Sequence, residues 1–161
     1  MPSNSEQDPP LPWSAFLDEL DQAISEPIEL HCIGGFVVSL RYGLPRPTGD
    51  VDYVAAIPRY RIEELEQLAG RGSKLGAKYE VYLQHVTVAT MPEDYESRLK
   101  EMFPGRFKKL KIFAPDPYDW FFPNWSGTAQ GIKVMSNIWQ KLCRWIPRFC
   151  GNDMRKNYAQ T

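Results

Sequence analysis

The sequence predicts an α/β (α+β) domain in which a small mixed β-sheet is flanked by helices. Two observations predict this class. Segments with helical and strand-like periodicity alternate along the first 119 residues, and glycines and prolines separate them. In addition, the 161 residues are 43% hydrophobic and 24% charged, which is ordinary for one globular domain with its own core.

The first half of the domain reads as helix, strand, helix and strand. Apolar residues at Phe16, Leu17, Leu20 and Ile24 have helical spacing and follow Ser14, the expected N-cap. The stretch "IELHCIGG" predicts a short strand ending in a glycine pair, and "FVVSLRYG" predicts a two-turn helix closed by glycine. After the loop "LPRPTG", the stretch "DVDYVAAI" alternates and then becomes wholly apolar, as a strand entering a sheet does.

The second half continues the alternation. "PRYRIEELEQLAGRG" predicts an amphipathic helix, and "YEVYLQHVTVAT" predicts either two strands or one long bent strand. "MPEDYESRLKEMF" predicts a helix that Pro92 opens, with acidic residues in its first turn. Within "GRFKKLKIFAPDPYD" we expect a basic edge strand at Leu110–Ala114.

Composition divides the chain into three parts. Residues 1–10 are polar and proline-rich and predict a disordered lead-in, whereas 11–119 form the domain. Residues 1–119 contain 13 Lys+Arg against 19 Asp+Glu, but residues 120–161 contain six basic residues and one acid. Four of the five tryptophans also lie in 120–161, so we call this part the basic aromatic segment.

Several classes of protein are disfavoured. No apolar run approaches the ~18–20 residues of a membrane helix, and the N-terminus lacks the features of a signal peptide. Cys32, Cys143 and Cys150 have no metal-binding spacing, and their odd number argues against a disulfide framework. We therefore expect a cytoplasmic protein without a membrane partner. His31 and His85 lie in predicted strands, where a histidine is more often structural than catalytic.

The stretch "RPTGDVDYV" carries the first candidate site. Asp50 and Asp52 are two residues apart in a predicted strand and therefore share one face. Two such carboxylates repel each other unless a cation lies between them or one is protonated. Mg²⁺ (or Mn²⁺) uses one or two carboxylates together with substrate phosphates. A polar strand end with both carboxylates in water is the alternative.

Gly34 and Gly35 carry the second candidate site, because they stand between a predicted strand and a predicted helix. Residues without side chains allow backbone N–H groups and the positive end of the helix to approach a phosphate. The alternative is a tight turn. Taken together with Asp50 and Asp52, however, the glycine pair predicts a phosphate cradle and a metal site separated by one short helix, as a nucleoside triphosphate requires.

The stretch "CIGGFVVSLRYGLPRPTGDVDYVAAIP" resembles the signature of the minimal nucleotidyltransferases of the DNA polymerase β-like superfamily. Arg46 and Thr48, together with "TMPEDYESRL" and "FKKLKIFA", are most similar to members from bacterial toxin–antitoxin and abortive-infection loci. The resemblance extends from about Leu17 to Asp119. It implies a nucleotidyltransferase-like fold and transfer of a nucleoside monophosphate from an NTP to RNA (a tRNA end) or to a protein hydroxyl. It also implies a cognate antitoxin or toxin as partner.

The resemblance also implies roles for individual residues. Asp50 and Asp52 would be catalytic and would bind the metal, whereas Gly34, Gly35 and Arg46 would contact the triphosphate. Thr48 would brace the nucleotide-binding loop. For Arg46 the alternative is a solvated loop charge, and for Thr48 it is a local cap in which the hydroxyl bonds to the backbone.

This sequence departs from the family pattern at the third carboxylate, which often serves as the general base. The stretch "HVTVAT" offers no carboxylate. The nearest candidates are Glu80, Glu93 and Asp94, and we expect none of them to be a catalytic base.

A second departure begins after Asp119, where relatives have a helix of the type "DLxLxKLxRNxxRDxxDVxxL". When residues 120–140 are read one base out of frame, suitable third bases give "LVLSKLERNSPRDQGDVKYLA". We therefore predict a one-nucleotide deletion after the Asp119 codon, and an activity impaired by it. The alternatives are a degenerate member that binds nucleotide or a partner without turnover, and a nucleic-acid-binding module that uses the basic aromatic segment.

Overall fold

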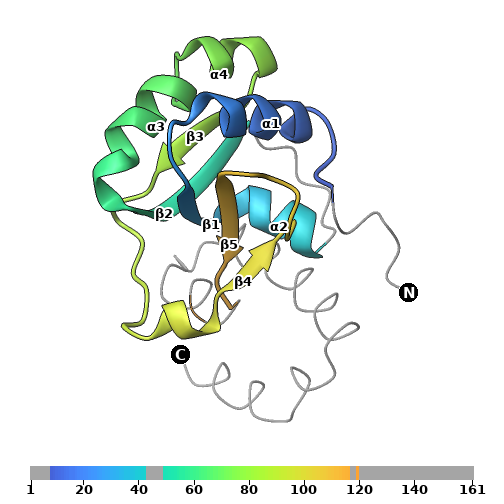
Figure 1. Ribbon diagram of the computed structural model, residues 1–161. Coiled ribbons are helices and arrows are strands. Elements are labelled where there is room, and N and C mark those ends of the chain that lie inside the picture. Colours follow the sequence, from blue (N-terminus) through green and yellow to red (C-terminus); the bar gives the residue numbers. More distant parts are fainter. Residues whose placement is uncertain (1–7, 43–48, 117–118, 120–161) are drawn as a thin grey trace, which may run out of the picture. The chain divides into compact units, whose positions relative to one another are not determined.

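Figure 1 shows the protein as a computed structural model, which describes residues 8–42, 49–116 and 119. Arg46, Thr48 and the basic aromatic segment, for which the altered reading frame is predicted, lie outside the described residues. Residues 8–10, which we expected in the disordered lead-in, are attached to the domain. Pro9 is buried, and Asp8 forms an ion pair with Arg106.

A five-stranded mixed sheet forms the centre of the domain, in the order β3-β2-β1-β5-β4. Its strands are β1 (Ile28–Ile33), β2 (Asp50–Ile57), β3 (Tyr82–His85), β4 (Lys100–Met102) and β5 (Leu110–Ala114). β1 pairs with β2 antiparallel and with β5 parallel, while β2 and β3 are parallel and β4 and β5 are antiparallel. The predicted class, an α/β (α+β) fold with a small mixed sheet, is therefore confirmed.

Helices flank this sheet. They are α1 (Trp13–Ala23), α2 (Gly34–Tyr42), α3 (Ile62–Ala69) and α4 (Lys74–Tyr79), with the 3-10 helices η2 (Arg59–Arg61) and η3 (Tyr95–Arg98). Figure 1 shows α1, α3 and α4 gathered on one side of the sheet, and α2 packs against β1 and β2. The core lies between these helices and the sheet.

Strand alternation and helical spacing explain the core. Alternate residues of each central strand point to the same face, and those facing the helices are buried. The four apolar positions predicted for the first helix are also fully or almost fully buried. The buried residues that make this core include Phe16, Leu17, Leu20, Ile24, Leu30, Cys32, Val51, Tyr53, Leu65, Leu83, Leu110 and Ile112.

Local predictions fail at three helices. α1 has Pro12 rather than Ser14 as its N-cap, so Ser14 lies within the helix. The helix α4 was not predicted, because its six residues are too few to show a helical period. Its start is explained by Ser73, whose Oγ accepts the backbone N–H of Gly76 at 2.9 Å. The helix expected from Pro92 onward is wrong, since only the short η3 forms there.

Strand predictions fail because a short stretch of sequence does not show which strands will pair with one another. In the β-rich stretch 79–90, only Tyr82–His85 forms a strand of the sheet. The residues after η3 pair with β5 as β4 instead of continuing a helix. β5 has the predicted bounds, Leu110–Ala114, but it lies between β1 and β4 and is therefore not an edge strand. Tertiary pairing has overridden local propensity.

Asp21 connects α1 to the start of β5. Its carboxylate accepts the backbone N–H groups of Lys108 at 3.1 Å and of Lys109 and Leu110 at 2.7 Å each. Burial raises the pKa of Asp21, but these three bonds outweigh burial and leave the pKa below its ordinary value. Lys109 also donates its Nζ to the carbonyl of Ile24. The carboxylate thus satisfies three donors that the strand does not pair.

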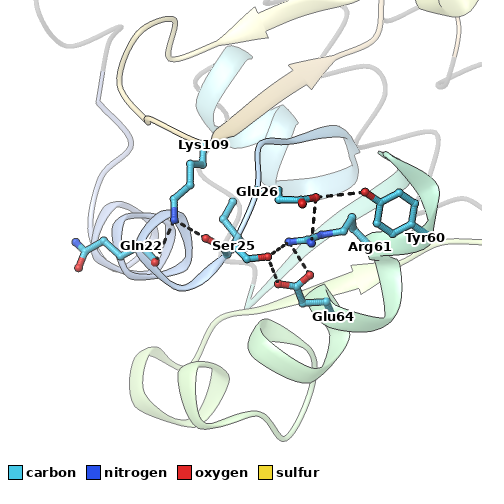
Figure 2. Close-up of polar contacts among 8 residues, drawn as sticks. Gln22, Ser25, Glu26, Tyr60, Arg61, Glu64 and Lys109 are labelled. Carbon is cyan, nitrogen blue, oxygen red and sulfur yellow. Dashed lines mark hydrogen bonds and ion pairs between the residues drawn. The ribbon is translucent and has the colours of Figure 1, made fainter.

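A polar cluster around Arg61 connects the turn after α1 to the start of α3 (Figure 2). Arg61 is 8% exposed, and its Nη2 donates to Ser25 Oγ at 2.7 Å and pairs with Glu64 at 2.7 Å. Its Nη1 donates to Glu26 Oε2 at 3.4 Å, which also accepts the hydroxyl of Tyr60 at 3.2 Å. This buried guanidinium is paired, as a buried charge must be.

Among the described residues, no helix has both the length and the apolar character needed to cross a membrane.

Candidate functional site

The turn between β1 and α2 lies beside the start of β2. In the antiparallel pair of β1 and β2, Ile33 is opposite Asp52. Gly34 follows Ile33 directly and begins α2. The structure therefore brings together the glycine turn and the aspartate pair, which are separate in the sequence.

Gly34 is constrained to be glycine by its conformation and by Asp52. Its φ of +75° lies in the left-handed region that disfavours other residues. A Cβ atom at this position would lie 2.5 Å from Asp52 Oδ2 and 3.3 Å from the Cβ of Asp52. The carboxylate of Asp52 is thus packed against the first residue of α2, where the helix dipole favours negative charge.

Gly35 is the second residue of α2 and is half-buried. Its φ is not among the positive values that Gly34, Gly72 and Gly105 adopt. Glycine at position 35 is therefore not required by backbone strain. The first turn of a helix nevertheless has N–H groups without intrahelical acceptors, and α2 begins with Gly34 and Gly35.

Asp50 and Asp52 lie on one face of β2, as predicted. Both are half-buried, whereas Val51 and Tyr53 between and after them are fully buried in the core on the other face. Oδ1 of Asp52 is shielded from solvent. The aspartates therefore occupy the face of the strand that points away from the core.

The parallel neighbour β3 adds two polar side chains to this face. Tyr82 is in register with Asp50, and Gln84 is in register with Asp52. Side chains in register on adjacent strands, about 4.8 Å apart, project from the same face of the sheet. Tyr82 and Gln84 cannot be identified from the sequence, because only the pairing of β2 with β3 reveals their position. The alternation in "VYLQH" indicates a strand, but not its neighbour.

The two histidines pack against aromatic side chains. His31 is 2% exposed, and its Nδ1 lies 2.8 Å from the hydroxyl of Tyr95. The rings of Tyr95 and Phe113 also pack edge-on against it. Burial lowers the pKa of His31. His85 stacks on the buried ring of Tyr53, with centroids 5.1 Å apart.

Cys32 lies in β1 just before the glycine turn and is completely buried. Burial raises the pKa of its thiol well above the usual range, and the nearby carboxylate of Asp52 raises it further. A thiol in this environment is a core side chain rather than a nucleophile.

The candidate third carboxylates lie elsewhere or have partners. The carboxylate of Asp94 accepts two bonds from Arg98, at 2.6 and 3.0 Å, and the bonding lowers the pKa of Asp94. Arg98 also donates to the buried Asp119. Glu80 is exposed and adopts the left-handed conformation after α4, and Glu93 is exposed. Over residues 8–42, 49–116 and 119, no group of three or more His, Cys, Asp or Glu could hold a metal.

The chain was compared with protein-family models, curated proteins and solved structures, and none of them matches it.

The site therefore consists of two carboxylates on one face of the sheet and a glycine turn. The turn begins α2 and lies against the carboxylate of Asp52. The carboxylates offer oxygen ligands of the kind that Mg²⁺ prefers. Two carboxylates are too few for a metal site made by protein alone, but they suit a metal ion that a phosphorylated substrate also binds. The residues thus fit a metal ion delivered together with a triphosphate.

Proposed function

We propose that this protein is a metal-dependent nucleotidyltransferase-like protein that transfers a nucleoside monophosphate from an NTP to a hydroxyl of RNA or protein. The observation that carries the proposal is the contact of Gly34 with the carboxylate of Asp52. This contact joins a helix N-terminus, suited to phosphate, to an aspartate pair, suited to a metal ion. The sequence resemblance supports the same activity, together with a cytoplasmic role in a bacterial toxin–antitoxin system with a cognate partner.

The proposed reaction uses the chain's own groups for binding and orientation. Asp50 and Asp52 would hold Mg²⁺ or Mn²⁺, which would neutralise charge on the phosphates when bound. The backbone N–H groups at Gly34 and Gly35 would face the triphosphate. By resemblance, Arg46 would contact the phosphates, and Thr48 would brace the loop that precedes Asp50.

In the chemical step, the acceptor hydroxyl oxygen forms a bond to the α-phosphorus. The bond from that phosphorus to the oxygen bridging to the β-phosphate breaks, and pyrophosphate leaves with this oxygen. The hydroxyl proton passes to water. No described carboxylate is assigned the role of general base, so catalysis would depend on positioning and on charge stabilisation.

Incubation of the full chain with α-labelled NTP and Mg²⁺ tests the proposal, with NTP binding and pyrophosphate release measured separately. We expect Mg²⁺-dependent binding that Asp50→Asn abolishes. Glu63→Gln, which removes one exposed carboxylate of α3, is the matched control and should bind as the wild type does.

Each outcome has a distinct meaning. Binding with turnover supports the enzyme, and binding without pyrophosphate release supports a degenerate member that only binds nucleotide. Binding that is absent, or that Asp50→Asn and Glu63→Gln reduce equally, would show that the aspartate pair is not a nucleotide site. Binding of nucleic acid that disappears only when residues 120–161 are removed would instead support a module based on the basic aromatic segment.

A further inference from the structure

Tyr82 extends the polar face of β2 toward the outer edge of the sheet. It lies on β3, the edge strand, in register with Asp50. Its side chain is half-buried, whereas the neighbours Val81 and Leu83 are buried in the core. The side chain therefore projects from the same face as the aspartates and is partly exposed to solvent.

Arg71 covers this ring. Its Cζ lies 4.8 Å from the centroid of the Tyr82 ring, and its Nη2 donates to the Tyr82 hydroxyl. The position of Arg71 is set by the turn that carries it, because Gly70 forms a β-bridge with Leu83 on the outer edge of β3. The backbone N–H of Ser73 closes the turn on the carbonyl of Gly70 at 3.1 Å. An exposed guanidinium thus lies over one face of a half-buried aromatic ring.

The pair lies on the opposite side of the aspartates from the glycine turn. In the sheet order β3-β2-β1, Gly34 follows β1 on one side of β2, whereas Tyr82 is on β3 on the other side. In-line displacement at phosphorus places the attacking oxygen and the leaving oxygen on opposite sides. If the leaving pyrophosphate faces Gly34, then the acceptor approaches from β3.

We propose that Arg71 and Tyr82 bind the acceptor, and that the acceptor is a single-stranded nucleic acid with a terminal hydroxyl. This inference rests on the proposed function and specifies its acceptor. An aromatic ring stacks on a base of any sequence, and a guanidinium pairs with the adjacent phosphate, so the two groups match one nucleotide. Lys74, exposed three residues after Arg71, adds a second positive charge at the start of α4.

The terminal hydroxyl oxygen of this strand forms the new bond to the α-phosphorus, and pyrophosphate leaves with the bridging oxygen. The hydroxyl proton is released to water. Arg71 and Tyr82 take no part in these bond changes and act as positioning residues. Their effect should therefore appear in acceptor binding and not in NTP binding.

Binding of a fluorescent ten-nucleotide single-stranded RNA with an unmodified 3′ end provides the test, measured by anisotropy on the full chain. We expect Arg71→Gln and Tyr82→Ala each to weaken binding roughly 10-fold. Tyr82→Phe keeps the ring and should retain binding. Arg71→Gln should also lower the slope of log K against log salt by about 0.7, as loss of one phosphate contact to a single strand does.

Arg59→Gln is the matched control, because Arg59 is also exposed but lies in η2, beyond the far end of β2 from Asp50. Far-UV circular dichroism and urea unfolding of each variant check that the fold is retained. The same titration with single-stranded DNA distinguishes an RNA acceptor from a general nucleic-acid acceptor.

The proposal is overturned if the wild type does not bind the oligonucleotide, or if Arg59→Gln weakens binding as much as Arg71→Gln. It is also overturned if NTP label is transferred to a protein hydroxyl with equal efficiency in wild type and Tyr82→Ala. The proposed function fails by a separate result, which is that the wild type shows no Mg²⁺-dependent NTP binding. Intact NTP binding with no effect of Arg71 or Tyr82 rejects only the acceptor site.

Discussion

Replacement of Gly34 by alanine tests the contact on which the candidate site depends. Two costs add at this position. A left-handed backbone costs an ordinary L-residue roughly 1–2 kcal/mol, of which about 0.4–1 kcal/mol is offset by the reduced entropy of the unfolded chain. The new Cβ would also lie 2.5 Å from Asp52 Oδ2, so the carboxylate or the start of α2 must move. Overpacking of this kind costs about 1–3 kcal/mol.

Gly72→Ala is the matched control. Gly72 has a similar φ, +83°, but nothing lies within 4 Å of an added Cβ. It therefore reports the backbone cost alone, about 1 kcal/mol. We expect Gly34→Ala to lower the free energy of unfolding by about 2–4 kcal/mol, and thus by at least about 1 kcal/mol more than Gly72→Ala. Urea unfolding measured by circular dichroism resolves a difference of this size.

A double-mutant cycle identifies the group that causes the excess. If the Asp52 carboxylate is that group, the combined loss in Gly34→Ala/Asp52→Ala should be smaller than the sum of the two single losses. Equal losses for Gly34→Ala and Gly72→Ala, or strict additivity in the cycle, would refute the packing of Asp52 against the turn. The site would then reduce to a polar strand end beside a tight turn.

Three further predictions concern other residues. Because its pKa is lowered in the folded state, Asp21 contributes stability that is present above the unfolded value of 3.8 and is lost as pH falls through the folded pKa. Asp21→Asn should therefore lower the free energy of unfolding by about 1–3 kcal/mol at pH 7. It should also reduce the pH dependence of the urea midpoint between pH 5 and about pH 3. The buried hydroxyl of Tyr53 has no hydrogen-bond partner in the described part of the chain, so Tyr53→Phe should raise the free energy of unfolding by about 1 kcal/mol. Gln84→Glu should place a third carboxylate beside Asp52 and tighten the binding of Mg²⁺ with NTP measured by calorimetry, and unchanged affinity would contradict a metal site at this end of β2.

Local features allowed the aspartate strand and the glycine turn to be predicted. The alternation of "DVDYVAAI" predicted β2 with its observed bounds, and it placed Asp50 and Asp52 on the face away from Val51 and Tyr53. These features are visible in the sequence because side-chain period and glycine conformation are properties of a few consecutive residues.

Pairing between distant segments could not be predicted in the same way. No local signal indicates that Tyr82 lies beside Asp50, or that residues after η3 join β5, because each depends on which strands become neighbours. For the same reason the sequence names only the nearest acids, Glu80, Glu93 and Asp94, and does not reveal which residue lies beside Asp52. The register instead shows that position 84 is the one beside Asp52, and that it is occupied by glutamine.

The aspartate pair itself argues for a ligand on energetic grounds. Two residues along a strand separate Asp50 from Asp52 by roughly 7 Å. At that distance two negative charges repel by about 0.6 kcal/mol in water and about 2.4 kcal/mol at an effective dielectric constant of 20. A helix N-terminus offsets part of this repulsion at Asp52, which lies against Gly34. A cation bound by both carboxylates would offset the repulsion between them directly. NTP at ten times its Kd in the presence of Mg²⁺ should therefore stabilise the wild type by about 1.4 kcal/mol, and it should not stabilise Asp50→Asn.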